Sequence, residues 1–161
     1  MDIFKEYNEL KSNIEFKKFT RDNKDYYLAH IVVPDDGSAL EIGFYNPKND
    51  KIIVFKTKPF EKGKEEDVFK EGKTITKLDI DKIKINFDQA MEQINHLLQN
   101  QYSAEIPKKK IIILQHIQEP VWNTTIVCQS LNIINIRINT ESGKIVRNDK
   151  SSLLNMAGVA K

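Results

Sequence analysis

Three histidines, one cysteine and several neighbouring carboxylates are the side chains in this sequence whose types could support catalysis or bind a metal ion. His30, His96 and His116 lie far apart, and none is four residues from another or next to the cysteine. A zinc site uses several His or Cys ligands at recognisable spacings. The spacing therefore predicts structural histidines and no metal site.

The single cysteine, Cys128, could act as a nucleophile only if the fold brought a base to it. It alternates in phase with Trp122 and Ile126 along an apolar stretch. A buried thiol has a raised pKa and behaves as a small hydrophobic side chain. We expect Cys128 to pack in the core, and one cysteine excludes an intramolecular disulfide and fits a reducing compartment.

Paired carboxylates occur at Asp35 and Asp36, at 65–67, and at Asp79 and Asp81, all in polar, lysine-rich surroundings. General acid–base catalysis needs carboxylates in a cleft that separates their pKa values, so we expect solvated loops here. With six glycines, the chain has no phosphate-binding loop and no nucleophile elbow. The sequence predicts a protein that is not an enzyme, with no catalytic residues and no cofactor.

The composition fits one ordinary domain, or two small ones, with a real core. The chain has 161 residues, 40% of them hydrophobic, and a formal charge of +2 from 25 basic and 23 acidic residues. Nucleic-acid binding would need a larger basic excess, and the basic tract 108–110 is interpreted as protecting an apolar strand from aggregation. There is no apolar run long enough to span a membrane and no secretion signal at the amino terminus, so we predict a cytoplasmic protein.

One helix is clearly indicated over residues 87 to 102. Apolar residues recur there at steps of three and four, and Asn86 with Gln89 resembles a capping box. A shorter helix is predicted over residues 2 to 12. After Asn13, the apolar residues Ile14, Phe16 and Phe19 suggest a strand with a change of phase.

Two stretches of strand-like sequence look like copies of one unit. The first runs from Tyr27 through a polar turn at 46–50 to Lys51, and the second runs from Trp122 through a turn at 140–143 to Lys144. Tyr27 then aligns with Trp122, and Lys51 aligns with Lys144. In the second copy, a bulge or sheet crossover is expected near Ile133 because the alternation changes phase there.

The predicted fold class is α+β, with two related units that each pack a helix on a curved antiparallel β-sheet. The first unit spans residues 1–57 and the second spans 86–161, and a charged segment over 58–85 connects them. The two units could pack together or merge their edge strands, and the pattern leaves both arrangements open.

The second half resembles the PepSY family. The resemblance rests on Phe87, Ala90 and Ile94 of the helix and on the hairpin 136–146 with its turn at Glu141, Ser142 and Gly143. It implies a cystatin-like fold, in which a helix lies on a curved sheet, and a role in holding or inhibiting peptidases. The family has no catalytic residues to transfer to this chain.

The favoured function is a non-catalytic binding or protein-interaction module with a protein partner, or a homo-oligomer joined through sheet edges or an exposed concave face. Four residues form the candidate binding surface: Trp122, His116, Tyr27 and His30. For Trp122 the favoured role is core packing over the second helix, and an anchor on a binding surface is the alternative. One alternative function is regulation of a peptidase. Another is a small-molecule or enzymatic cavity between helix and sheet, with His30 or His116 as its polar group.

Overall fold

A computed structural model gives the structure of this protein, and residues 1–68 and 74–156 are described here. They form an α+β fold in which a nine-stranded antiparallel sheet is combined with four α-helices and one 3-10 turn. The elements in chain order are α1 (Ile3–Ser12), α2 (Ile14–Asp22), β1 (Tyr27–Pro34), β2 (Glu41–Asn46), β3 (Lys51–Lys56), β4 (Glu61–Lys62), β5 (Glu66–Asp67), η1 (Ile80–Lys82), α3 (Phe87–Gln101), β6 (Pro107–Ile117), β7 (Glu119–Cys128), β8 (Asn132–Asn139), β9 (Ile145–Ser152) and α4 (Leu153–Met156).

All strands belong to one continuous sheet, which settles the arrangement that the sequence left open. The strand order is β4-β3-β2-β1-β6-β7-β8-β9, and β5 pairs with β3. The central pair is β1 with β6, in which His30 lies opposite Gln115 and Pro34 lies opposite Ile111. Outward from this pair, neighbouring strands are antiparallel and are joined by short connections. The central pair itself joins residues that are about 80 positions apart in the chain.

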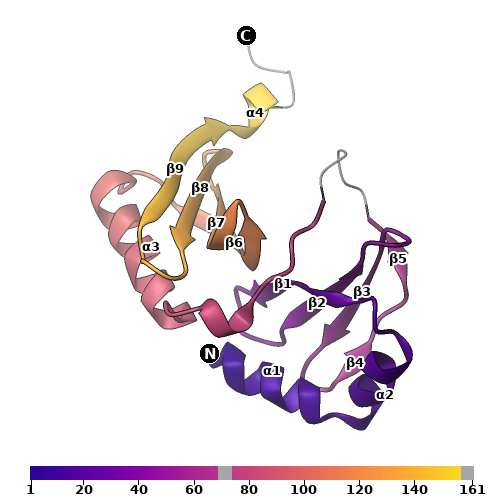
Figure 1. The fold of residues 1–161 in the computed structure, drawn as a ribbon. Helices are drawn as coiled ribbons and strands as arrows, with labels where there is room; N and C mark the ends of the chain where they lie inside the picture. The colour runs from indigo at the N-terminus through magenta and orange to yellow at the C-terminus, as the bar shows by residue number, and fades with distance from the viewer. Residues whose placement is uncertain (69–73, 157–161) are drawn as a thin grey trace.

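The three longer helices lie on one side of this sheet (Figure 1). Side chains that point to that side form the main hydrophobic core, which contains Ile31 of β1, Leu114 of β6 and Ile94 of α3, each 0% exposed. The sheet is bent about its centre, and the helices lie on the outer side of the bend (Figure 1). The opposite side of the sheet carries none of the helices α1, α2 and α3 (Figure 1).

Residues 14 to 22 are helical, so the strand predicted around Phe16 and Phe19 is wrong. The Asn13 side chain accepts a hydrogen bond from the Phe16 backbone N–H at 3.2 Å and caps a new helix. Phe19 lies three positions after Phe16, which places both rings on one face of a helix, and both are buried. Asn13 thus ends α1 and starts α2 at the same point.

The predicted helix over residues 87 to 102 is confirmed as α3. Its capping box is complete, because the Asn86 side chain accepts from the Gln89 N–H at 2.8 Å and the Gln89 side chain accepts from the Asn86 N–H at 2.9 Å. Ala90, Ile94 and Leu97 form its buried face. The capped start of the helix fixes where the second half of the fold begins.

The bulge predicted near Ile133 is not present in the strand pairing. β7 and β8 pair regularly from Val127 opposite Ile133 to Val121 opposite Asn139. Ile133 and Ile134 simply point to opposite faces of the sheet, as neighbours in a strand do, and both are buried. The chain reverses before them at Leu131, whose φ is 67°.

The segment before η1 passes from one side of the sheet to the other beside β1. On the helix-free side, the Tyr27 hydroxyl donates a hydrogen bond to the carbonyl of Ile75. Three residues later, Leu78 lies in the core on the helix side and its N–H donates to the Leu28 carbonyl at 2.9 Å. This segment therefore occupies the place beside the start of β1 that β6 leaves unpaired.

Candidate binding face

Two of the four sequence-predicted residues, Tyr27 and His30, lie on the side of the sheet without α1, α2 and α3, and we call this side the helix-free face. The strand register defines its members, because residues opposite each other in neighbouring strands point to the same side. From β3 to β9 these side chains are Ile52, Val54, Lys56, Glu41, Gly43, Tyr45, Tyr27, His30, Val32, Pro34, Lys109, Ile111, Ile113, Gln115, Ile117, Glu119, Val121, Asn123, Thr125, Val127, Ile133, Asn135, Arg137, Asn139, Arg147, Asp149 and Ser151.

The centre of the helix-free face is apolar and half-buried. Val32 of β1 lies opposite Ile113 of β6, and Pro34 lies opposite Ile111. Ile111 is 37% exposed, although it belongs to a central strand. Because the helices cover only the other side, these side chains form an apolar strip that a further molecule could cover.

Strands β7, β8 and β9, which with β6 form the second half of the sheet, place polar groups beside this strip. The Arg137 Nε donates to the Asn123 side-chain oxygen at 3.4 Å, and Arg147 is paired with Asp149 at 2.5 Å. Burial and the neighbouring charge of Arg147 lower the pKa of Arg137. Within the described chain Arg137 forms no ion pair, so its charge is available to an incoming carboxylate.

His30 lies over Gly43 on the helix-free face. A side chain at position 43 would bring its Cβ within 2.2 Å of the His30 Cε1 atom, so the imidazole occupies the space that glycine leaves open. Burial lowers the pKa of His30, and the charge of Glu41 partly opposes this effect. The ring is therefore neutral at pH 7.

Tyr27 is held in place by its neighbours on the same face. Its ring meets that of Tyr45 edge-on, with the ring centres 5.7 Å apart, and its hydroxyl donates to Ile75. The Tyr45 hydroxyl in turn donates to Asp50. Tyr27 thus anchors the segment that crosses the sheet, while His30 lies nearer the apolar centre.

Trp122 and His116 lie on the opposite side of the sheet from Tyr27 and His30. Trp122 is 1% exposed, its Nε1 donates to the Ile85 carbonyl at 2.8 Å, and its ring packs edge-on against Phe87. This burial places Trp122 in the core and removes it from any surface. The His116 Nδ1 is also buried, without a hydrogen-bond partner among the described residues. The structure thus brings together two of the four predicted residues.

Cys128 also points to the core, as predicted, and burial raises the pKa of its thiol. Over residues 1–68 and 74–156, no group of three or more His, Cys, Asp or Glu side chains is placed to hold a metal ion. In the same part of the chain, no helix has the length and apolar character needed to cross a membrane.

Arg137, Asn123 and Ile113 belong to the face and were not predicted from the sequence. The alternation of β7 and β8 shows which residues share a side, and it could have grouped Arg137 with Asn123. Placing Ile113 beside Val32 requires the pairing of β1 with β6, and no local pattern signals a pairing over that distance in the chain.

Comparison with known proteins finds no matching family and no matching curated protein. One solved structure is similar in fold: the crystal structure, at 1.85 Å resolution, of a candidate lipoprotein from Clostridium difficile 630. The two chains are 17% identical, the TM-score is 0.55, and the match covers 85% of this chain and 90% of that chain. At this identity the similarity shows the fold alone.

Proposed function

We propose that this protein is a non-catalytic binding protein and that its helix-free face holds a partner protein. The observation that supports this is the strip formed by Val32, Ile113 and Ile111, which stays half-buried or exposed at the centre of a sheet whose other side is covered by helices. Apolar surface at the centre of a polar rim is typical of protein interfaces.

The shape and charge of the face define the partner. The helix-free face lies on the inner side of the bend in the sheet (Figure 1), so a convex surface fits it better than a second copy of the same inward-bent face. Arg137 adds a charge that has no ion-pair partner in the described chain. The partner is therefore a different protein that presents a convex apolar surface with a carboxylate at one side.

We further infer that the two halves of the sheet are related units. The support is the order of elements: helix and then antiparallel strands occur on each side of the central pair. Superposition of β1–β3 on β7–β9, which follows the alignment of Tyr27 with Trp122 and of Lys51 with Lys144, tests this, and strands that do not overlay in the same order would argue against it. A peptidase as the partner would give the narrower, PepSY-like function.

A photo-crosslinking residue placed at Ile111 tests the proposed face. In the organism that encodes the protein, benzoylphenylalanine at position 111 should crosslink to one partner, and the same residue at His96, exposed on α3, should not. Mass spectrometry then identifies the partner. Equal crosslinking from both positions, or none at position 111, would count against the face.

A charge reversal gives the matched control. Arg137→Glu should reduce the yield of the crosslinked product about tenfold, because it places a carboxylate against the partner's carboxylate. Arg21→Glu, at an exposed position on α2, should leave the yield unchanged. A stable homodimer in solution that Arg137→Glu dissociates would instead assign the face to a second copy.

A further inference from the structure

We propose that a groove between α2 and residues 77–81 binds a small organic anion with an aromatic or aliphatic body. This groove lies on the helix side of the first half of the sheet, away from the helix-free face, and the proposal is independent of the function given above. The ligand's acidic group would meet lysines at the rim, and its apolar part would rest between tyrosine rings.

The groove has the size and position of a ligand site. Its volume is about 630 Å³, within the range of about 300–1,000 Å³ that is usual for small-molecule pockets. Helices α1 and α2 form one wall, and residues 77–81 form the other. The buried side chains of Phe19, Phe44 and Leu78 lie beneath it, so the base of the groove is part of the rigid core.

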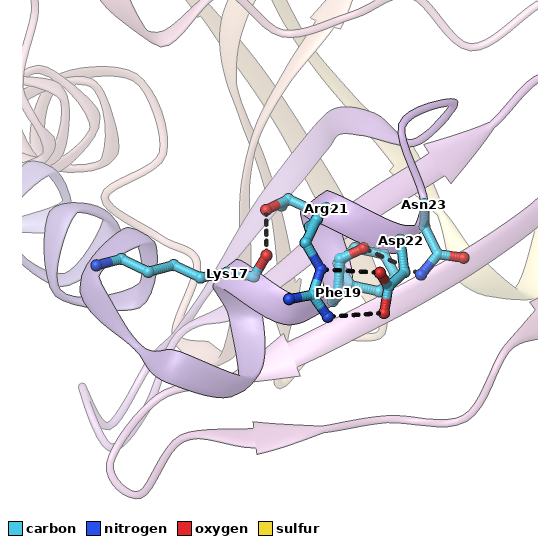
Figure 2. Close-up of polar contacts among 6 residues, drawn as sticks. Lys17, Phe19, Arg21, Asp22 and Asn23 are labelled. Atoms are coloured by element: carbon cyan, nitrogen blue, oxygen red, sulfur yellow. Dashed lines mark hydrogen bonds and ion pairs between the residues drawn. The ribbon is translucent and has the colours of Figure 1, made fainter.

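Local hydrogen bonds hold the α2 wall in place. At the end of this helix the Asn23 side-chain amide donates to the Phe19 carbonyl at 3.0 Å, and the Thr20 hydroxyl donates to the Lys17 carbonyl at 3.0 Å (Figure 2). The adjacent ion pair of Arg21 with Asp22 stays within the helix end (Figure 2). These contacts tie side chains of the last turns of α2 to its own backbone without a ligand, so the wall is formed in advance.

The opposite wall is fixed in a similar way. The Asp79 side chain accepts a hydrogen bond from the Asp81 backbone N–H at 3.1 Å and caps the short turn η1. Leu78 anchors this wall to β1 through its hydrogen bond to the Leu28 carbonyl. Both walls thus keep their separation when the groove is empty, which lowers the entropy cost of binding.

The charges at the rim favour an anion. Lys11, Lys24 and Lys77 line the groove, and none of them forms an ion pair within the described chain. Two acidic groups, Asp79 and Asp81, oppose them, but Asp79 is engaged in capping η1. Lys24 follows the end of α2 on one wall of the groove and Lys77 lies on the opposite wall, and these two lysines are therefore the groups assigned to the ligand's acidic part.

The apolar part of the ligand would contact tyrosine rings. Tyr7 and Tyr26 both line the groove and are half-buried, and the Lys11 ammonium lies 5.1 Å from the centre of the Tyr7 ring. Burial and the charge of Asp81 raise the pKa of Tyr7, which keeps its hydroxyl neutral. Neutral aromatic faces beside ammonium groups suit a flat or chain-like body that ends in a carboxylate or sulfonate.

Two probes of equal shape and opposite charge test the assignment. The full-length, ¹⁵N-labelled protein is titrated with naphthalene-2-sulfonate and, separately, with 2-naphthylmethylammonium, and the amide signals are followed by NMR. The anion should shift the signals of Asn23, Lys24 and Lys77 and bind about tenfold more tightly than the cation. Equal affinities, or shifts centred elsewhere, would overturn the proposal.

Charge removal provides the second test. Lys24→Ala combined with Lys77→Ala should weaken binding of the sulfonate about tenfold, whereas Lys18→Ala combined with Lys64→Ala, at exposed positions outside the groove, should not. Both double variants change only surface lysines, and their folding is checked directly from the same spectra. Equal weakening by both pairs would show general attraction of the dye to a basic protein. Either failure leaves the crosslinking result at Ile111 unaffected, so the two proposals are tested separately.

Discussion

Replacing Gly43 by alanine is the sharpest test of how the centre of the helix-free face is built. The backbone of Gly43 has no positive φ, so alanine is compatible with the strand itself. The added Cβ would nevertheless lie 2.2 Å from Cε1 and 2.5 Å from Nε2 of His30. The imidazole must therefore leave its position over β2.

The expected cost follows from these distances. Forcing an extra methyl group into a packed site costs roughly 1–3 kcal/mol, and alanine in place of glycine in a strand returns roughly 0.5–1 kcal/mol. We expect Gly43→Ala to lower the free energy of unfolding by about 1–2 kcal/mol. In a His30→Ala background the clash is gone, so Gly43→Ala should be neutral or stabilising by about 0.5 kcal/mol.

The double-mutant cycle is measured by urea unfolding, with the fluorescence of the single, buried Trp122 as the signal. For a chain of this length, 1 kcal/mol corresponds to about 2–4 °C in Tm, so a thermal scan gives an independent value. The reasoning fails if Gly43→Ala is equally destabilising with and without the His30 imidazole, because the cost would then come from the backbone.

Three further predictions concern single groups. Burial lowers the folded-state pKa of His30, so the unfolded chain binds a proton first as the pH falls. The free energy of unfolding should therefore be unaffected by this group above about pH 6.5 and should decline below it. His30→Gln should flatten this decline, measured by urea titrations at several pH values. Asn86→Ala removes half of the capping box and should cost about 1 kcal/mol by far-UV circular dichroism, whereas Asn86→Ser should restore most of it. Thr57→Val should lower the free energy of unfolding by about 1–3 kcal/mol, because the buried Leu40 N–H and the Glu6 carboxylate both lose their hydrogen bond to the Thr57 hydroxyl. The control Thr20→Val, at an exposed position, should change it by less than about 0.5 kcal/mol, and both are measured by chemical denaturation.

The sequence was sufficient to predict the secondary-structure elements that have a strong local pattern. The helix that begins after Asn86 has a capping box and a long apolar stripe, and both are local properties of fifteen residues. The fold class follows from the same evidence, since helices with one apolar stripe and strands with one apolar side must cover each other. The strand prediction around Phe16 and Phe19 was wrong because two apolar residues are too few to distinguish a short helix from an irregular strand. The capping role of Asn13, which marks the start of α2, was also missed.

The site could be predicted only in part, because it depends on which strands meet at the centre. Tyr27 and His30 lie close together in one strand and share a side, although a bulge between Leu28 and His30 alters the simple alternation. Trp122 aligns with Tyr27 in the proposed repeat, yet it faces the core where Tyr27 faces the helix-free side. An alignment of sequences gives equivalent positions along two strands, but the register of the sheet decides the side.

The segment of residues 75–85 supports the helix-free face where no helix does. Ile75 is held by Tyr27 on one side of the sheet and Leu78 is held by Leu28 on the other, so the first half is clamped at the point where β1 and β6 separate. Farther along, the Ile85 carbonyl accepts from Trp122 in the second half. One short segment therefore contacts both halves of the sheet, and under the proposed function a partner would bind a surface already in place, with little loss of conformational entropy. Weakening the Trp122 contact would then loosen the bend itself and reduce partner binding from a residue that the partner never touches.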